Sequence, residues 1–301
     1  MADRTKLQRW FTRSIAQPVE GAIALALFRL LGAISADWAS AIGGWLGRNF
    51  GPWIGVTRRA RRNLERAFPD KSPAEITAII GEMWDNLGRV AAEYPHLSRL
   101  EPFRKDGRFE LRGLDHVDAA LARRRPIILF GAHLANWEVG GVAAIQYGLP
   151  LHIVYRPANN PWVERLFRKG RGDISRSLIQ KGAAGARAAI AMLEKGEPLG
   201  ILVDQKMNDG IAVPFFGRDA MTAPAIAQLA LRFDCTVLPV QVERLGGMRF
   251  RLTVHPPLEL SRTGDRLADI TSIMTRVNAI VEDWIRQRPG QWLWVHRRWS
   301  D

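Results

Sequence analysis

A histidine and a glutamate five residues apart, His133 and Glu138, carry the clearest chemistry in this sequence. Residues five apart on a straight helix are rotated by roughly 140° and do not share a face. The two side chains can meet if His133 lies in a turn and Glu138 lies in the first turn of the following helix, with Asn136 as its N-cap. An imidazole oriented by a carboxylate can take a proton from a hydroxyl group. The alternative is a histidine that is merely hydrogen-bonded at the end of a strand.

Strand-like and helix-like segments alternate around this pair. The predicted strands are residues 127–130, 151–155, 177–179, 199–203, 236–243 and 249–255, and the predicted helices are residues 72–98, 136–147, 161–170, 183–195, 223–233 and 265–287. This alternation predicts an α/β fold with a mixed, largely parallel sheet flanked by helices. Gly246-Gly247 predicts an antiparallel hairpin between the last two strands. His133 then follows a buried strand at its carboxyl end, where α/β folds keep their sites.

The composition indicates a polyanionic partner. The formal charge is +13, and 47% of the 301 residues are hydrophobic. The single cysteine, Cys235, excludes an internal disulfide and is expected in the core. The sequence has no Walker loop, no dinucleotide fingerprint, no serine nucleophile elbow and no spaced zinc ligands. We therefore expect no metal and no soluble cofactor, and the lack of RNA-binding or zinc-finger patterns argues against nucleic acid.

The N-terminal region contains an apolar run at residues 21–36, interrupted by Arg29 and flanked on both sides by basic residues. The run is shorter than the roughly 20 residues of a spanning helix, and no cleavage site follows it cleanly. These features predict a hydrophobic anchor helix that is either interfacial or a short span, and the alternative is a buried hairpin. We place the boundary near residue 105, between an anchor and helical segment (1–104) and an α/β catalytic domain (105–301).

The His133-x-x-x-x-Glu138 pair resembles the H-x(4)-D/E motif of glycerolipid-type acyltransferases. With its flanks it is similar to the late acyltransferases of lipid A biosynthesis, the lauroyl/myristoyl transferase family, over most of the chain after about residue 25. The supporting segments are Tyr155-Arg-Pro-Ala-Asn-Asn-Pro161, Gly170-Arg171, Val203-Asp204-Gln205, Val213-Pro-Phe-Phe-Gly217 with Thr222, and Gln291-Trp-Leu-Trp-Val-His-Arg-Arg298.

This resemblance implies transfer of a fatty acyl group from acyl-acyl carrier protein to a hydroxyl of an acyl chain on an anionic lipid A precursor. It implies a bacterial inner-membrane enzyme whose catalytic domain contacts the membrane surface on the cytoplasmic side. An imidazole with the ordinary histidine pKa of about 6.5 can accept the hydroxyl proton. His133 is then the general base, Glu138 holds its tautomer, and backbone N–H groups at 135–137 or a basic side chain stabilise the oxyanion.

Further substrate-binding candidates come from the same comparison. Arg171 matches an arginine of the family, and Arg156 ends a predicted strand on the same side. A guanidinium at either position can bind a lipid phosphate or the phosphopantetheine of the donor, and the alternative is a surface arginine. Asp204 ends the predicted strand 199–203 and is expected to pair with Arg171, in a substrate-binding or a purely structural role. Asn136 completes the candidate set.

Two other functions remain open at this stage. One is acylation of a different membrane lipid, such as a lysophospholipid, aminolipid or glycolipid, with acyl-CoA or acyl-carrier protein as donor. The other is a non-catalytic membrane- or lipopolysaccharide-binding protein, in which the positive charge and the 11 tryptophans carry the function. The second predicts that replacement of His133 has no effect.

Overall fold

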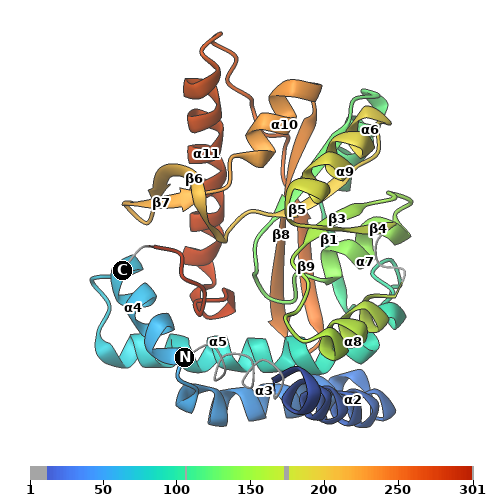
Figure 1. The fold of residues 1–301 in the computed structure, drawn as a ribbon, viewed down its shortest axis with the longest axis vertical. Coiled ribbons are helices and arrows are strands. Elements are labelled where there is room, and N and C mark those ends of the chain that lie inside the picture. The colour runs from blue at the N-terminus through green and yellow to red at the C-terminus, as the bar shows by residue number, and fades with distance from the viewer. Residues whose placement is uncertain (1–11, 106, 173–175, 300–301) are drawn as a thin grey trace.

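The computed structural model describes residues 12–105, 107–172 and 176–299 (Figure 1). Helices make up the N-terminal third of this part of the chain. They are η1 (Thr12–Ala16), α2 (Gln17–Ala33), α3 (Ala36–Phe50), η2 (Gly51–Trp53), α4 (Thr57–Ala67), α5 (Pro73–Glu93) and η3 (Tyr94–Arg99). At the start of α5 the hydroxyl of Ser72 accepts a hydrogen bond from Glu75 N–H, and the Glu75 carboxylate accepts one from Ser72 N–H. This capping box fixes the predicted helix start.

A seven-stranded sheet lies at the centre of the rest of the fold. Its strands are β1 (Phe109–Arg112), β2 (Ile127–Gly131), β3 (His152–Tyr155), β4 (Ser177–Gln180), β5 (Leu199–Leu202), β8 (Thr236–Gly246) and β9 (Arg249–Val254). They lie in the order β1-β9-β8-β2-β5-β3-β4. Neighbouring strands are parallel except for the β8–β9 hairpin. The predicted α/β fold with a mixed, largely parallel sheet is therefore confirmed.

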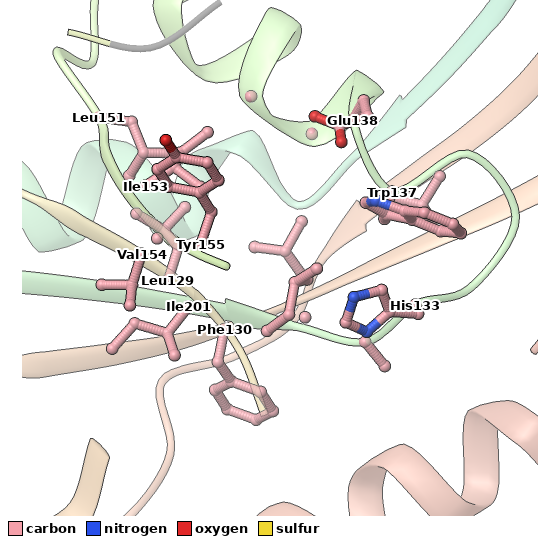
Figure 2. A pocket seen from close by; sticks show the side chains of 18 of the residues that line it. Leu129, Phe130, His133, Trp137, Glu138, Leu151, Ile153, Val154, Tyr155 and Ile201 are labelled. Carbon is pink, nitrogen blue, oxygen red and sulfur yellow. The ribbon is translucent and has the colours of Figure 1, made fainter. Parts of the chain in front are cut away.

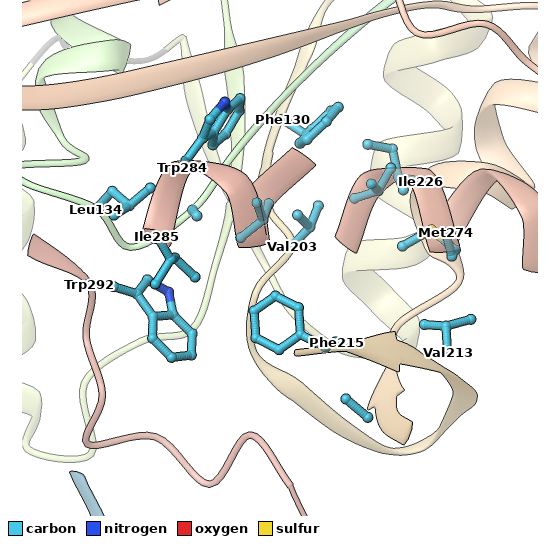
Figure 3. Packing of buried hydrophobic residues seen from close by; sticks show 14 of the residues in the cluster. Phe130, Leu134, Val203, Val213, Phe215, Ile226, Met274, Trp284, Ile285 and Trp292 are labelled. Carbon is cyan, nitrogen blue, oxygen red and sulfur yellow. The ribbon is translucent and has the colours of Figure 1, made fainter. Parts of the chain in front are cut away.

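Helices cover both faces of this sheet (Figure 1). They are α6 (Leu114–Ala122), α7 (Val139–Gln146), α8 (Pro161–Arg171), α9 (Ala183–Glu194), α10 (Ala225–Phe233) and α11 (Arg266–Gln287), and a short turn η4 (Pro289–Gln291) follows α11. Strand β2 shows why two layers are needed, since its side chains alternate between two cores. Ile128 and Phe130 pack with α10 and α11, as Figure 3 shows for Phe130, whereas Ile127 and Leu129 pack with α6 and α7.

Two parts of the fold differ from the sequence-based prediction. Strand β6 (Lys206–Phe215) and strand β7 (Arg218–Thr222) form a separate antiparallel hairpin that was not predicted. Phe215, at the end of this hairpin's first strand, lies in the core against Trp292 (Figure 3). Helix α7 begins at Val139, so Asn136 lies in the turn before the helix and is not its N-cap.

The apolar N-terminal helix is present, and it lies on the outside of the protein. Thr12–Ala33 is the one helix in the described residues that is long and apolar enough to cross a membrane. Its apolar residue Ile23 is 57% exposed, and Trp38 of α3 is 67% exposed. The alternative of a buried hairpin is therefore wrong.

Candidate active site

His133 and Asp204 meet because β2 and β5 are neighbouring parallel strands. Gly131 at the end of β2 pairs with Leu202 at the end of β5. Each strand is followed two residues later by a polar side chain, His133 and Asp204 respectively. The carboxyl ends of parallel strands lie at one edge of a sheet, which brings the imidazole and the carboxylate together.

Asp204 orients the His133 ring. Its Oδ1 lies 2.8 Å from His133 Nδ1, and its Oδ2 accepts hydrogen bonds from His133 N–H (2.9 Å) and from the Trp292 indole N–H (2.7 Å). Burial alone would raise the pKa of Asp204, but the attraction of His133 and these hydrogen bonds hold that pKa well below its ordinary value. The carboxylate is therefore ionised and fixed. The predicted contact in which Glu138 orients the His133 ring is wrong, because the carboxylate bonded to His133 Nδ1 is that of Asp204.

The geometry assigns the proton of the neutral ring to Nδ1 and leaves the lone pair on Nε2. The Gln205 amide nitrogen lies 3.3 Å from His133 Nε2 and 3.2 Å from His296 Nε2, while its oxygen accepts a hydrogen bond from Lys181 Nζ (3.4 Å). An amide in this orientation donates to both rings, which fits two unprotonated Nε2 atoms. Burial first, and the nearby His133 second, lower the pKa of His296 to about 4.

Glu138 takes part in a separate ion pair. Its two oxygens accept hydrogen bonds from Arg171 Nη2 (2.6 Å) and Nε (2.9 Å), and one of them also accepts from the Tyr94 hydroxyl. Burial disfavours the charged carboxylate, but the Arg171 contact outweighs it and lowers the pKa of Glu138. The predicted pairing of Arg171 with Asp204 is therefore wrong, since the guanidinium is bonded to Glu138.

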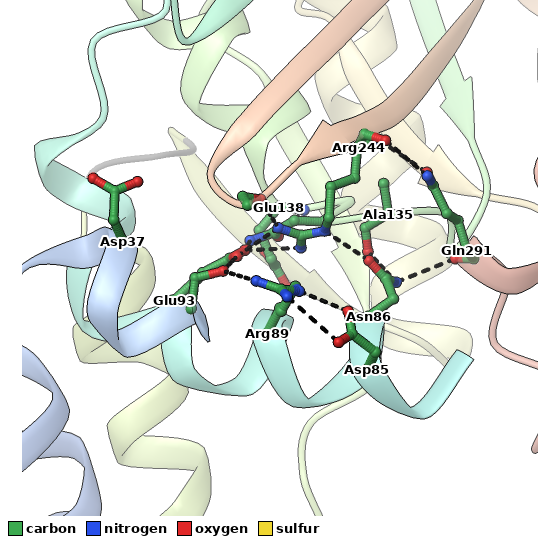
Figure 4. A network of polar contacts seen from close by, with 12 residues as sticks. Asp37, Asp85, Asn86, Arg89, Glu93, Ala135, Glu138, Arg244 and Gln291 are labelled. Carbon is green, nitrogen blue, oxygen red and sulfur yellow. Dashed lines mark hydrogen bonds and ion pairs between the residues drawn. The ribbon is translucent and has the colours of Figure 1, made fainter. Parts of the chain in front are cut away.

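The loop between His133 and Glu138 is held from below by a buried polar network (Figure 4). Asn86 of α5 donates to the carbonyl of Ala135 (3.0 Å), a residue with a left-handed backbone (φ 51°). Asn136 donates to Glu93 (2.7 Å) and accepts from Glu138 N–H (3.2 Å). Asn136 is buried and uses its side-chain amide to donate one hydrogen bond and accept another, so it helps to position the loop.

The carboxylate of Glu93 is neutralised by an arginine of the β8–β9 hairpin. Arg244 donates to both Glu93 oxygens (2.6 and 3.0 Å) and to Asn86 (2.9 Å). Gln291 connects the C-terminal segment to the same loop, because its carbonyl accepts from Ala135 N–H (3.0 Å). Three distant parts of the chain therefore fix the backbone that carries His133 (Figure 4).

A cavity of about 180 Å³ opens beside His133. Figure 2 shows His133, Trp137 and Glu138 at one end and Leu151 and Ile153 at the other. The apolar part of the wall includes Leu129, Gly140, Gly141, Leu151, Ile153, Gly200, Ile201, Val240 and Val242. The basic side chains of Arg156, Arg171 and Lys181 also line it. The cavity thus combines an apolar interior with a basic and imidazole-bearing end.

The structure brings some of the site residues proposed from the sequence together around this cavity. His133, Glu138, Arg156 and Arg171 line the cavity, whereas Asp204 and Asn136 are buried behind it. Tyr94 and Lys181 were not proposed from the sequence. Nor was His296, whose ring lies 5.4 Å from that of His133.

The comparison with known proteins identifies the family. The family described as bacterial lipid A biosynthesis acyltransferase matches residues 10–301. The chain is 29% identical over 255 residues to the lipid A biosynthesis lauroyltransferase of Escherichia coli K12, which covers 81% of this chain and 80% of that protein. It is 24% identical over 285 residues to the phosphatidylinositol mannoside acyltransferase of Mycolicibacterium smegmatis, with coverage of 90% and 88%. The chain therefore belongs to the bacterial lipid A biosynthesis acyltransferase family.

Proposed function

We propose that the protein transfers a fatty acyl chain from acyl-acyl carrier protein to a hydroxyl of an acyl chain on a lipid A precursor. The observation that carries the proposal is the His133 ring. Its Nδ1 is bonded to the buried Asp204, and the ring lines a mainly apolar cavity. Such a ring is suited to take a proton from a hydroxyl whose lipid lies alongside.

The reaction requires His133 to move one proton twice. A substrate hydroxyl replaces the Gln205 amide at Nε2 and gives its proton to the ring as its oxygen attacks the thioester carbonyl. Asp204 stabilises the resulting imidazolium. When the tetrahedral intermediate collapses, the carbon–sulfur bond breaks and the imidazolium returns the proton to the departing thiolate. The products are an ester and the free carrier-protein thiol, with no covalent enzyme intermediate.

Lys181 is our candidate for the oxyanion stabiliser. Of the backbone donors proposed from the sequence, Ala135 N–H is already bonded to the carbonyl of Gln291. Lys181 lines the cavity and lies 3.4 Å from the Gln205 amide that contacts His133. Burial lowers its pKa from the ordinary 10.5, yet it is attracted to Asp204. An ammonium group near the reacting carbonyl would favour the negative charge that develops there.

Arg156 and Arg171 are proposed to contact anionic parts of the substrates. Arg156 is exposed directly after β3 and lines the cavity, in a position from which it can reach a phosphate group. Arg171 uses Nε and Nη2 for Glu138 and Tyr94, so a further contact would involve Nη1. The charge of +13 suits an acidic carrier protein and a phosphorylated lipid. We place the enzyme at the bacterial inner membrane with its catalytic domain on the cytoplasmic side.

A second acceptor class deserves a direct comparison, because the mycobacterial relative is named for phosphatidylinositol mannoside. The same His133–Asp204 geometry would serve a sugar hydroxyl of a glycolipid. The purified protein should therefore be offered labelled acyl-carrier protein or acyl-CoA with a tetra-acylated lipid A precursor, phosphatidylinositol mannoside or a lysophospholipid.

We expect transfer from acyl-carrier protein to the lipid A precursor. His133→Ala should lower kcat by about 10²- to 10⁴-fold, the usual contribution of a general base. Transfer only to another acceptor would replace the proposed substrate and keep the mechanism. Full activity of the His133→Ala protein would refute the mechanism, and the non-catalytic alternative would be favoured if no pair of substrates reacts.

A further inference from the structure

Helices α2 and α3 each expose an apolar stripe. On α2 and its C-cap the stripe is Val19, Ile23, Leu27, Leu30 and Ile34, and on α3 it is Trp38, Ile42, Trp45, Leu46 and Phe50. Steps of three and four residues place each set on one helical face. Every one of these side chains is at least 38% exposed. Such large apolar surfaces on a folded chain mark an interaction site.

The opposite face of each helix is packed against the body of the protein. In α3, a Cβ at Gly43 would lie 2.4 Å from the carbonyl of Gly88, and a Cβ at Gly47 would lie 2.0 Å from that of Trp84. The backbones of α3 and α5 are thus in direct contact. Figure 1 places α2 and α3 together at the base of the molecule, below α8 and α5. Both apolar stripes therefore face away from the body.

Helix α2 is attached to the body near both of its ends. Near its N-terminus, Asn160 Nδ2 donates to the carbonyl of Gln17 (2.9 Å). Near its C-terminus, His96 Nε2 lies 3.0 Å from the carbonyl of Leu31. These two attachments are fourteen residues apart, which is about 21 Å along a helix. A helix that crossed the roughly 30 Å hydrocarbon core would carry the body with it through most of that depth.

Helix α8 makes such a crossing costly, because it lies along α2. A Cβ at Gly21 would lie 2.3 Å from Trp162 Cβ, and Phe28 lies beside Gly170. Between these contacts α8 carries charged side chains, namely Glu164, Arg165, Arg168 and Lys169, and Arg171 follows. Charged groups within the hydrocarbon core are strongly disfavoured.

A basic helix continues from the apolar surface. Trp53 is 80% exposed, and it is followed by exposed Ile54 and then by α4. This helix has five arginines and one acidic residue, namely Arg58, Arg59, Arg61, Arg62, Arg66 and Glu65. Tryptophan and arginine side chains next to an apolar surface fit the headgroup region of an anionic bilayer.

We infer that α2 and α3 form a platform that lies within one leaflet of an anionic lipid bilayer, with α2 parallel to the membrane surface and not across it. The apolar stripes enter the acyl-chain region, and α4 contacts the headgroups. Because α8 lies on α2 and carries Arg171, the platform holds the cavity at a fixed height above the lipid. The inference rests on the packing of α2 and does not require the proposed reaction.

Thiol labelling tests the path of α2 in the full chain. Ser14→Cys and Ala33→Cys introduce thiols at exposed positions near the two ends of the helix, and Ala122→Cys on α6 reports the position of the sheet domain. The native Cys235 is a suitable silent background, because burial raises the pKa of its thiol to about 12. A membrane-impermeant maleimide is applied to spheroplasts and to inside-out vesicles. We expect all three thiols to react from the same side. Reaction of Ser14→Cys and Ala33→Cys from opposite sides would overturn the inference.

Vesicle flotation tests the contribution of α3 separately. Detergent-purified protein is diluted onto vesicles of phosphatidylglycerol and phosphatidylcholine. The double variant Trp38→Asp/Trp45→Asp should lower the partition coefficient by at least about 10-fold. Leu267→Asp is a matched control, since Leu267 is 68% exposed on a different helix. Unchanged binding of the double variant, or a stable dimer that does not bind vesicles, would contradict the platform.

Discussion

Two carboxylates near His133 have opposite surroundings. Asp204 is bonded to an imidazole and to a neutral indole, so the imidazolium would be its directly bonded cation once it forms. Glu138 is already neutralised by a two-point contact with Arg171. A carboxylate whose charge is already compensated in the resting protein interacts only slightly more strongly with a cation that forms in the transition state, so it contributes little to the rate. From this comparison we propose that Asp204 acts in the reaction through His133 and that Glu138 has a structural role, although Glu138 is the member of the sequence motif.

The largest expected effect concerns the stability of the Glu138–Arg171 pair. Glu138→Gln leaves a mostly buried guanidinium without its partner, which should lower the free energy of unfolding by about 3–5 kcal/mol. The double variant Glu138→Gln/Arg171→Met removes both charges and should recover much of that loss. Chemical denaturation of Glu138→Gln, Arg171→Met and the double variant measures the coupling free energy between the two side chains. Additive losses in the double variant would show that the pair is not a structural unit.

A smaller effect, on the preference for acyl-chain length, is expected from a change at Gly140 in the cavity wall. A Cβ at Gly140 of α7 would meet Val242 Cγ2 at 4.0 Å, so a larger side chain fits there and extends into the cavity. Gly140→Val should shift the preference towards shorter acyl chains by about 10-fold in kcat/KM, as expected for the loss of space for one or two methylenes. Competition between acyl-carrier proteins of different chain length measures the shift. An equal loss with all chains would instead indicate a damaged site.

The smallest expected effect is on acid stability. Both carboxylates have folded-state pKa values below their ordinary values of 3.8 for Asp204 and 4.5 for Glu138. Their contribution to stability is therefore complete above about pH 4.5 and is lost as the pH falls further. Thermal unfolding from pH 6 to pH 3 should show a decrease in Tm that is smaller in Asp204→Asn. A variant with the same pH dependence as the wild type would argue against the lowered pKa of Asp204.

Local sequence signals predicted the elements of the fold well, and the partners of the site residues poorly. The helix that starts after Ser72 and the strand before His133 depend on signals from neighbouring residues, and both are confirmed. The order of strands in a sheet has no such local signature. Two strands, β3 and β4, lie between β2 and β5 in the sequence, yet β2 and β5 pair directly.

The missed contacts also depend on tertiary structure. Tyr94 reaches Glu138 from the end of α5, and Trp292 reaches Asp204 from the C-terminal segment. The hairpin of β6 and β7 was missed because the first half of β6 contains Asn208, Asp209 and Gly210, which are disfavoured in strands, and Pro214 follows near its end. Asn278 of α11 supports it by donating to the carbonyl of Pro214 (3.0 Å).

The most direct test of the central claim compares Asp204→Asn with Glu138→Gln in one acyl-transfer assay, with the folded fraction of each protein determined in parallel. If Asp204 orients His133, Asp204→Asn should lower kcat by about 10²- to 10⁴-fold, because an amide cannot stabilise the imidazolium. Glu138→Gln, corrected for its folded fraction, should keep kcat within about 10-fold of the wild type. A Glu138→Gln protein that is folded but has lost its activity, beside an active Asp204→Asn protein, would contradict the account.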